Sequence, residues 1–251
     1  MSQALLAGLW GLVGGAALLI GSAIAWWFKV PTKVTAAVMA FGAGVLISAL
    51  TFELVEKAEE QGGLLATLGG ALFGAFAYLG ANMVLARHGA RHRKRSGSQQ
   101  PSEADQQGSG TAIAVGALLD GVPESIVLGL GLVGGAAVSP AMLVAVFISN
   151  VPEGLSSTSG MKRSGRRAGY VFGVWGAIAV VSGLASLIGY LALQSAPGEV
   201  IAFITATAAG AILTMVADTM VPEAFDEAGQ YSGIITTVGF LAAFSVHVVG
   251  G

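Results

Sequence analysis

The chain contains no cysteine and few charged residues. Only 10% of its 251 residues are Asp, Glu, Lys or Arg, whereas a soluble domain carries about 25%. The absence of cysteine excludes disulfides and thiolate metal ligands. The shortage of charge, together with 54% hydrophobic residues, predicts an integral membrane protein. We therefore expect membrane lipid as a partner and no nucleic acid.

Apolar segments of about 20 residues run between the few charged clusters, and this length crosses roughly 30 Å of hydrocarbon as a helix. The basic region of a signal peptide does not precede the first segment, so we take that segment as a mature helix. We count eight spans, covering residues 4–27, 34–56, 63–86, 111–136, 140–160, 167–194, 198–223 and 233–250. The sequence therefore predicts an all-α membrane protein with eight transmembrane helices.

The basic residues predict the orientation of these helices. Eleven of the twelve Lys and Arg residues lie in the segments 29–33, 87–95 and 162–167, which eight spans place on one side of the membrane. Only Lys57 falls on the other side. The positive-inside rule then puts both termini outside the cytoplasm. We expect a multi-pass protein of the plasma membrane, the inner membrane if the source is bacterial.

The spans and one polar segment divide the chain into four parts. Residues 1–86 hold the first three helices, 87–110 form a basic cytoplasmic loop, 111–160 hold helices four and five, and 161–251 hold the last three. The loop is rich in Arg, Ser, Gln and Gly. This composition predicts a flexible linker. Either its His88 and His92 hold a metal ion in transit, or the segment is a solvated basic loop that anchors the topology.

Two Val-Pro-Glu motifs, at 122–124 and 151–153, interrupt apolar stretches of the fourth and fifth spans. A carboxylate near the middle of a bilayer costs about 2.5 to 3.5 kcal/mol, so repeated ones point to function. Each proline frees the carbonyl four residues earlier, here that of Leu119 or Ile148. Carboxylate oxygens beside a bare carbonyl are ligands that suit a hard or borderline divalent cation.

Neighbouring polar residues complete a candidate ligand set. On a helix Asp120 shares a face with Glu124, and Glu153 shares a face with Ser149 or Asn150. We predict that two facing helices bring these five residues to one metal ion. An all-oxygen shell fits Mn, Mg, Ca or Fe(II), and Zn is less favoured without imidazole. The alternative is that the carboxylates are protonated packing residues at two proline kinks.

Further polar residues in the spans suggest an ion pathway. Glu53 near the outer end of the second span and Asp218 near the cytoplasmic end of the seventh are either entrance and exit ligands or interfacial charges.

A weak internal repeat points to a carrier. At an offset of 166 residues, Ala43, Gly44, Val55 and Ala58 match Ala209, Gly210, Val221 and Ala224. The two spans concerned run in opposite directions. The match therefore suggests two inverted three-helix repeats around a central proline-kinked helix pair, which is the pattern of alternating-access carriers.

With these features the chain resembles the ZIP family of divalent metal transporters. Members of that family have eight spans, outside termini and a variable cytoplasmic loop between spans three and four. The fourth span carries a His-Asn-x-Pro-Glu-Gly type motif and the fifth a related one. The matching positions are Asp120, Gly121, Glu124 and Ser125 in the first motif, and Ser149, Asn150, Glu153 and Gly154 in the second.

The resemblance implies a homodimeric carrier with no enzymatic activity and no organic cofactor. Its substrate would be a divalent metal ion such as Zn, Mn, Fe(II) or Cd, moved by alternating access. Asp120 and Ser149 stand where the family has imidazole or amide ligands, and Ser186 stands where a sixth-span Glu is usual. Ser186 is then a possible pathway residue. The resemblance implies a single oxygen-rich site whose metal preference need not be zinc.

Three other functions stay open. A proton- or sodium-linked carrier of an organic solute would use the same carboxylates to relay protons. It would need a neutral or cationic solute, since no membrane-embedded Lys or Arg is present to neutralise an anionic one. An intramembrane enzyme could use the hydroxyls of residues 156–159, but no Lys or His on a neighbouring span is placed to activate one. The third is a relative that keeps the fold and has lost transport.

Overall fold

A computed structural model describes residues 2–94, 100, 102, 105–106, 109–135 and 139–250. Within these ranges the chain is helical and has no strand, so the all-α prediction is confirmed. The long helices are α1 (Gln3–Trp27), α2 (Thr32–Ala49), α3 (Glu56–Leu85), α4 (Ser109–Leu130), α5 (Pro140–Arg163), α6 (Ala168–Leu193), α7 (Gly198–Met215) and α9 (Tyr231–Gly250). The shorter ones are the π-helical turns η1 (Leu50–Val55), η2 (Ala86–Ala90) and η4 (Val216–Met220), the 3-10 turn η3 (Val133–Gly135) and α8 (Val221–Ala228).

Several helices are long and apolar enough to cross a membrane, as expected of a multi-pass membrane protein. In the described part of the chain six stretches meet this criterion: Gln3–Trp27, Thr32–Ala90, Thr111–Leu130, Ala168–Leu193, Gly198–Ala228 and Tyr231–Val249. The second is 59 residues long and contains α2 and α3. Helix α5 is not among the six, and its second half is rich in Ser and Thr.

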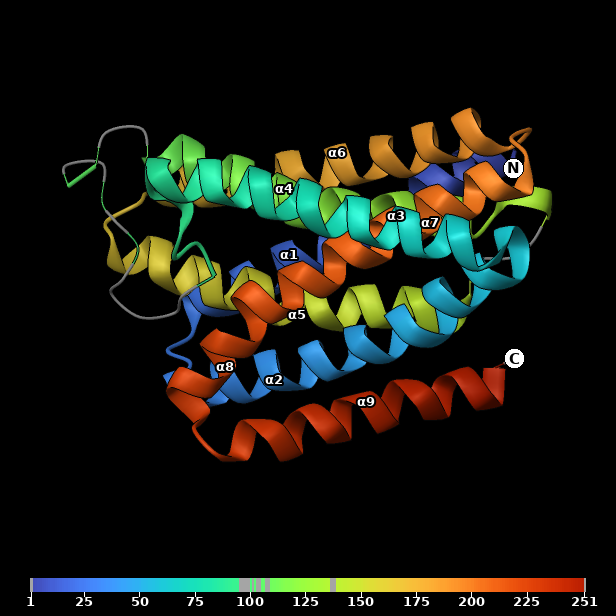
Figure 1. Cartoon of the computed structure of the whole chain (residues 1–251). Helices are drawn as coiled ribbons and strands as arrows, with labels where there is room; N and C mark the ends of the chain where they lie inside the picture. Colours follow the sequence, from blue (N-terminus) through green and yellow to red (C-terminus); the bar gives the residue numbers. More distant parts are fainter. Residues whose placement is uncertain are drawn as a thin grey trace.

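Two glycines reverse the direction of the chain. Gly63, with φ +75°, lets α3 fold back after α2 and η1, and Gly229, with φ +59°, does the same between α8 and α9. Residues with a Cβ rarely adopt such angles. The returning α3 lies along α7, and α9 lies along α2. Figure 1 shows the resulting bundle, with both chain termini at one end.

Other glycines let these two helix pairs approach closely. A Cβ atom on any of four glycines would collide with a backbone carbonyl oxygen of the facing helix. The contacts are Gly44 with Thr236 and Gly239 with Phe41 between α2 and α9, and Gly210 with Ala71 and Gly74 with Thr207 between α7 and α3. Such contacts matter in a membrane, where helices associate by packing and not by the hydrophobic effect.

Substitution of Gly74 by valine is expected to destabilise the protein, because the added side chain collides with the Thr207 carbonyl. Overpacking of this kind costs roughly 1 to 3 kcal/mol. Gly80 on the same helix has nothing within 4 Å of a built Cβ, so Gly80→Val is the matched control. Thermal unfolding in detergent should show a lower midpoint for Gly74→Val alone. Equal midpoints for the two variants would contradict this account of the packing.

Helices α4 and α5 lie inside the bundle. Helix α4 packs on α6, α1 and α7, and α5 packs on α1 and α2. Both helices continue through their prolines, Pro123 and Pro152. Their apolar side chains, among them Leu128 and Val146, join one core cluster with residues of α2 and α7. The two Val-Pro-Glu motifs are therefore held by central helices.

Candidate functional site

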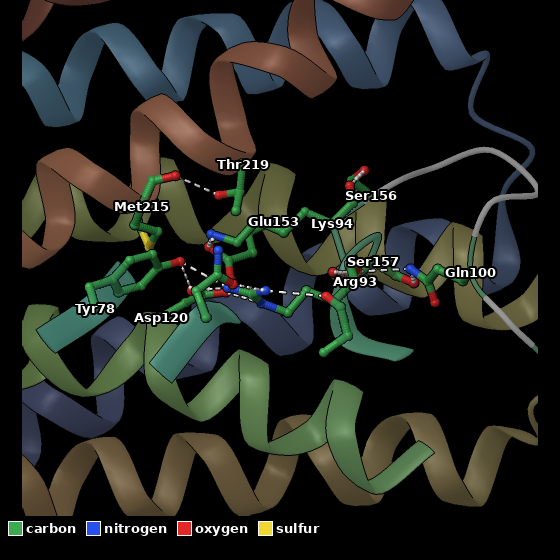
Figure 2. A network of polar contacts seen from close by, with 12 residues as sticks. Tyr78, Arg93, Lys94, Gln100, Asp120, Glu153, Ser156, Ser157, Met215 and Thr219 are labelled. Atoms are coloured by element: carbon green, nitrogen blue, oxygen red, sulfur yellow. Dashed lines mark hydrogen bonds and ion pairs between the residues drawn. The ribbon is translucent and has the colours of Figure 1, made fainter. Parts of the chain in front are cut away.

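Asp120 of α4 is the centre of a buried polar network. Arg93 binds its carboxylate through two hydrogen bonds, Nε to Oδ2 and Nη2 to Oδ1, both 2.8 Å long. The Tyr78 hydroxyl donates a third, of 2.7 Å, to Oδ1. Figure 2 shows these side chains turned toward one another. A two-pronged contact between guanidinium and carboxylate is among the strongest polar contacts in proteins.

The Arg93 side chain is fully satisfied. Besides the two bonds to Asp120, it donates from Nη1 to Asn82 Oδ1 (2.8 Å) and to the Ala90 carbonyl (3.2 Å), and from Nη2 to the Tyr78 hydroxyl (2.8 Å). A guanidinium has five N–H donors, and all five are used here. With 2% of its surface exposed, Arg93 is an anchored part of the bundle.

Lys94 links the two motif helices. Its Nζ lies 2.9 Å from Glu153 Oε2 on α5 and 3.5 Å from Asp120 Oδ2 on α4. Burial by itself would lower the pKa of Lys94, but the carboxylates of Asp120 and Glu153 outweigh it and raise that pKa above its ordinary value. The side chain is therefore a charged ammonium at neutral pH, shared by two carboxylates from different helices.

Glu124 is the carboxylate left without a partner. It is 1% exposed, and within the described residues neither of its oxygens has a hydrogen-bond partner. Glu153, Lys94 and Asp120 all lie within electrostatic range of it. An unpaired buried polar group is costly, so such groups in native proteins call for an explanation. Two acceptor oxygens thus remain available in the cluster.

The other residues of the predicted ligand set make contacts elsewhere. The Ser149 hydroxyl donates to the Val146 carbonyl of its own helix at 3.0 Å, and the Asn150 amide donates to the Gly14 carbonyl of α1 at 3.0 Å. The Ser186 hydroxyl donates to the Ala7 carbonyl at 2.7 Å and so joins α6 to α1. The structure brings Asp120, Glu124 and Glu153 into one cluster, whereas these three polar side chains bond to backbone.

The two predicted pathway acids lie outside the cluster. Glu53 accepts 2.7 Å hydrogen bonds from Lys57 and, at its other oxygen, from His247 of α9. It lines a cavity of about 310 Å³ together with Gln61, Ser139 and residues of α4 and α7. Asp218 is exposed on η4. Glu53 is thus partnered at the edge of a cavity.

Two hydroxyls of α5 hold the backbone that carries the cationic side chains. Ser156 donates to the Lys94 carbonyl and Ser157 to the Arg93 carbonyl. The Gln100 amide donates to the same Arg93 carbonyl (2.8 Å) and to the Ser157 carbonyl (3.1 Å). The expectation of solvated basic side chains is wrong for Arg93 and Lys94, which are buried. The carboxylates of Asp120 and Glu153 replace water as partners of the two side chains, and the α5 hydroxyls bind their backbone.

Sequence reasoning missed Tyr78, Arg93, Lys94, Ser156 and Ser157 as parts of this cluster. One signal was present, since three carboxylates in the central helices need a buried counter-charge. In the described part of the chain no three Asp, Glu or His side chains are grouped closely enough to hold one metal ion. In this conformation Arg93 and Lys94 form ion pairs with Asp120 and Glu153.

Comparison of the chain with protein-family models and with curated proteins finds no match.

Proposed function

We propose that the chain is a membrane carrier that moves a divalent metal ion through the carboxylate cluster of α4 and α5. One contact supports this most directly: a single ammonium group, that of Lys94, lies between Asp120 on one proline-containing helix and Glu153 on the other. The cluster therefore already binds a cation at the junction of the two helices. The two unpartnered oxygens of Glu124 add acceptors beside it.

The chemistry of the cluster suits a hard or borderline divalent ion. Carboxylate oxygens are the ligands that Mg, Mn and Fe(II) prefer, and Zn also accepts them. Asn150, on the same face of α5 as Glu153, can add its amide oxygen, because its hydrogen bond to the Gly14 carbonyl uses only the amide nitrogen. The metal is the substrate in this proposal, and it takes the place that the Lys94 ammonium has in the structure.

Internal similarity supports transport by alternating access. At the offset of 166 residues, Gly44 and Gly210 make equivalent close contacts, Gly63 and Gly229 both reverse the chain, and the π-helical turns η1 and η4 begin at equivalent positions. We therefore propose two inverted three-helix units, one before and one after α4 and α5. Carriers built from inverted units with a central site work by exposing it to each side in turn.

The proposed topology has eight spans, with α2 and α3 counted separately and α5 included. Both termini lie at one end of the bundle, which an even number of crossings requires. The distribution of basic residues places that end outside the cytoplasm. We also propose a homodimer in the plasma membrane, on the resemblance alone.

The test is metal uptake into proteoliposomes that contain the purified protein. Zn, Mn, Fe(II), Cd and Mg are compared, and vesicles without protein are the control. We expect saturable uptake of at least one of these ions. Absence of uptake for all five would overturn the proposal.

The buried cations favour one alternative, a relative that keeps the fold and has lost transport, because Arg93 and Lys94 already neutralise Asp120 and Glu153. The same two residues are cationic groups beside the motifs, which the sequence argument against anionic solutes did not consider. An anion would nevertheless find no free donor on Arg93, whose five donors are used.

A further inference from the structure

We propose that Lys94 is a tethered competitor of the transported ion and that this competition makes the site selective for divalent over monovalent cations. The inference rests on the proposed function and adds a specificity-determining residue to it. Residues 93–94 dock against α5. They belong neither to the Val-Pro-Glu motifs nor to the positions that carry the family resemblance.

The docking has a backbone component that is independent of charge. Ser156 and Ser157, one turn beyond Glu153 on α5, donate to the carbonyls of Lys94 and Arg93. Both hydroxyl side chains are buried, with 0% and 2% of their surface exposed. Helix α5 therefore holds the backbone of residues 93–94 directly beside Glu153, the carboxylate that Lys94 contacts.

The two cationic side chains differ in how firmly they are held. Arg93 makes five hydrogen bonds to four different residues, and its departure would take both guanidinium hydrogen bonds away from Asp120. Among the described residues Lys94 has two ionic contacts, and of these the one to Glu153 is the shorter, at 2.9 Å. Its ammonium sits on a flexible four-carbon stem with rotatable donors. Arg93 is thus the fixed member of the pair and Lys94 the exchangeable one.

Formal charges then decide which ion displaces Lys94. Arg93 cancels the charge of Asp120. When Glu124 and Glu153 are both deprotonated, they carry two negative charges against the single charge of Lys94. A monovalent ion has the same charge as the Lys94 ammonium, so it gains no charge balance by replacing it. Lys94 is in addition held at the site by the chain, so the free monovalent ion does not displace it. Tethering of this kind corresponds to an effective concentration in the millimolar range or above. A divalent ion matches both carboxylates, so it alone gains charge balance from the exchange.

Lys94→Gln removes the tethered charge and is the direct test. We expect the half-saturating concentration of the transported divalent ion to fall by about tenfold or more, as tethering arguments allow. We also expect Na⁺ to compete with divalent uptake in the variant at concentrations that leave the wild type unaffected. Arg91→Gln is the matched control, because Arg91 is an exposed neighbour in the same segment and loses the same charge. The control should behave like the wild type.

A second variant reports on the displacement itself and keeps Lys94 in place. The natural chain has no cysteine, so Ser157→Cys carries one thiol, beneath the docked segment. We expect Mn²⁺ to speed its labelling by a water-soluble maleimide several-fold and the same ionic strength of Na⁺ to leave the rate unchanged. Addition of Glu153→Gln should remove the effect of Mn²⁺.

The outcomes separate the two proposals. Divalent uptake in the wild type, with Lys94→Gln and Arg91→Gln equal in half-saturation and in Na⁺ competition, overturns the role of Lys94 and leaves the carrier standing. Labelling of Ser157→Cys that Mn²⁺ does not change overturns that role even if Lys94→Gln fails to fold. Absence of divalent uptake in the wild type overturns both proposals together.

Discussion

Replacement of Glu153 or Glu124 by alanine is expected to abolish divalent uptake in proteoliposomes while the protein still folds. Glu153 is the carboxylate that α5 contributes to the cluster, and Glu124 contributes its two unpartnered oxygens. Without either one, the cluster loses a charged ligand that a dehydrated divalent ion needs. Tracer uptake into vesicles measures the loss, and size-exclusion chromatography of the variants checks their folding.

Glu59→Ala is the control for these two variants. Glu59 is an exposed carboxylate of α3, outside the cluster, so uptake should match that of the wild type. If Glu153→Ala and Glu124→Ala both kept wild-type uptake, the assignment of the site would be wrong. A loss with only one of them would place the ion on one helix and not between two.

The two carboxylates should differ in their effect on stability. Glu153→Ala leaves the buried Lys94 ammonium with one distant partner, whereas Glu124→Ala removes a group that has none. Deletion of an unsatisfied buried polar group is close to neutral, but an ammonium left unpaired is destabilising. The midpoint of thermal unfolding should therefore fall for Glu153→Ala and change little for Glu124→Ala.

Much of the fold could be predicted because it depends on local properties of the chain. Apolar segments of membrane-spanning length mark the helices, and the prediction of a fifth helix from 140 corresponds to α5, which begins at Pro140. The offset of 166 residues was visible in Gly44 and Gly210, and the structure gives both the same role in helix packing. A match of this kind can be found in the sequence because close packing of two helices requires a small residue at the point of contact.

The cationic half of the cluster could not be predicted, because it depends on a tertiary contact. Arg93 and Lys94 lie in a run of basic residues, and such a run is usually a solvated face. Small polar side chains were misleading for a related reason. Ser149 and Ser186 each satisfy their hydroxyl with a backbone carbonyl, a contact that leaves no trace in the sequence.

Asp120→Ala is expected to cost the most stability of any single change in the cluster. It leaves the fully buried Arg93 guanidinium without its carboxylate and Tyr78 without its acceptor. Removal of one partner of a buried ion pair costs roughly 3 to 5 kcal/mol. Thermal and denaturant unfolding in detergent measures this loss. The comparison is Lys57→Met, which removes the half-exposed partner of Glu53 and should cost about 1 kcal/mol or less.

The double variant Asp120→Leu with Arg93→Met tests whether the Arg93–Asp120 ion pair stabilises the bundle. The alternative is that the two charges only cancel each other, without a net gain in stability. Apolar replacement of both members of a buried pair is often neutral or stabilising, because the cost of desolvating two charges disappears. We therefore expect the double variant to recover most of the stability that Asp120→Ala loses. Additive losses in the double variant would contradict this and would mean that the five hydrogen bonds of Arg93 hold the bundle together. Recovery would instead mean that the Arg93–Asp120 pair does not stabilise the fold. Its role would then be to determine the net charge next to Lys94, Glu124 and Glu153.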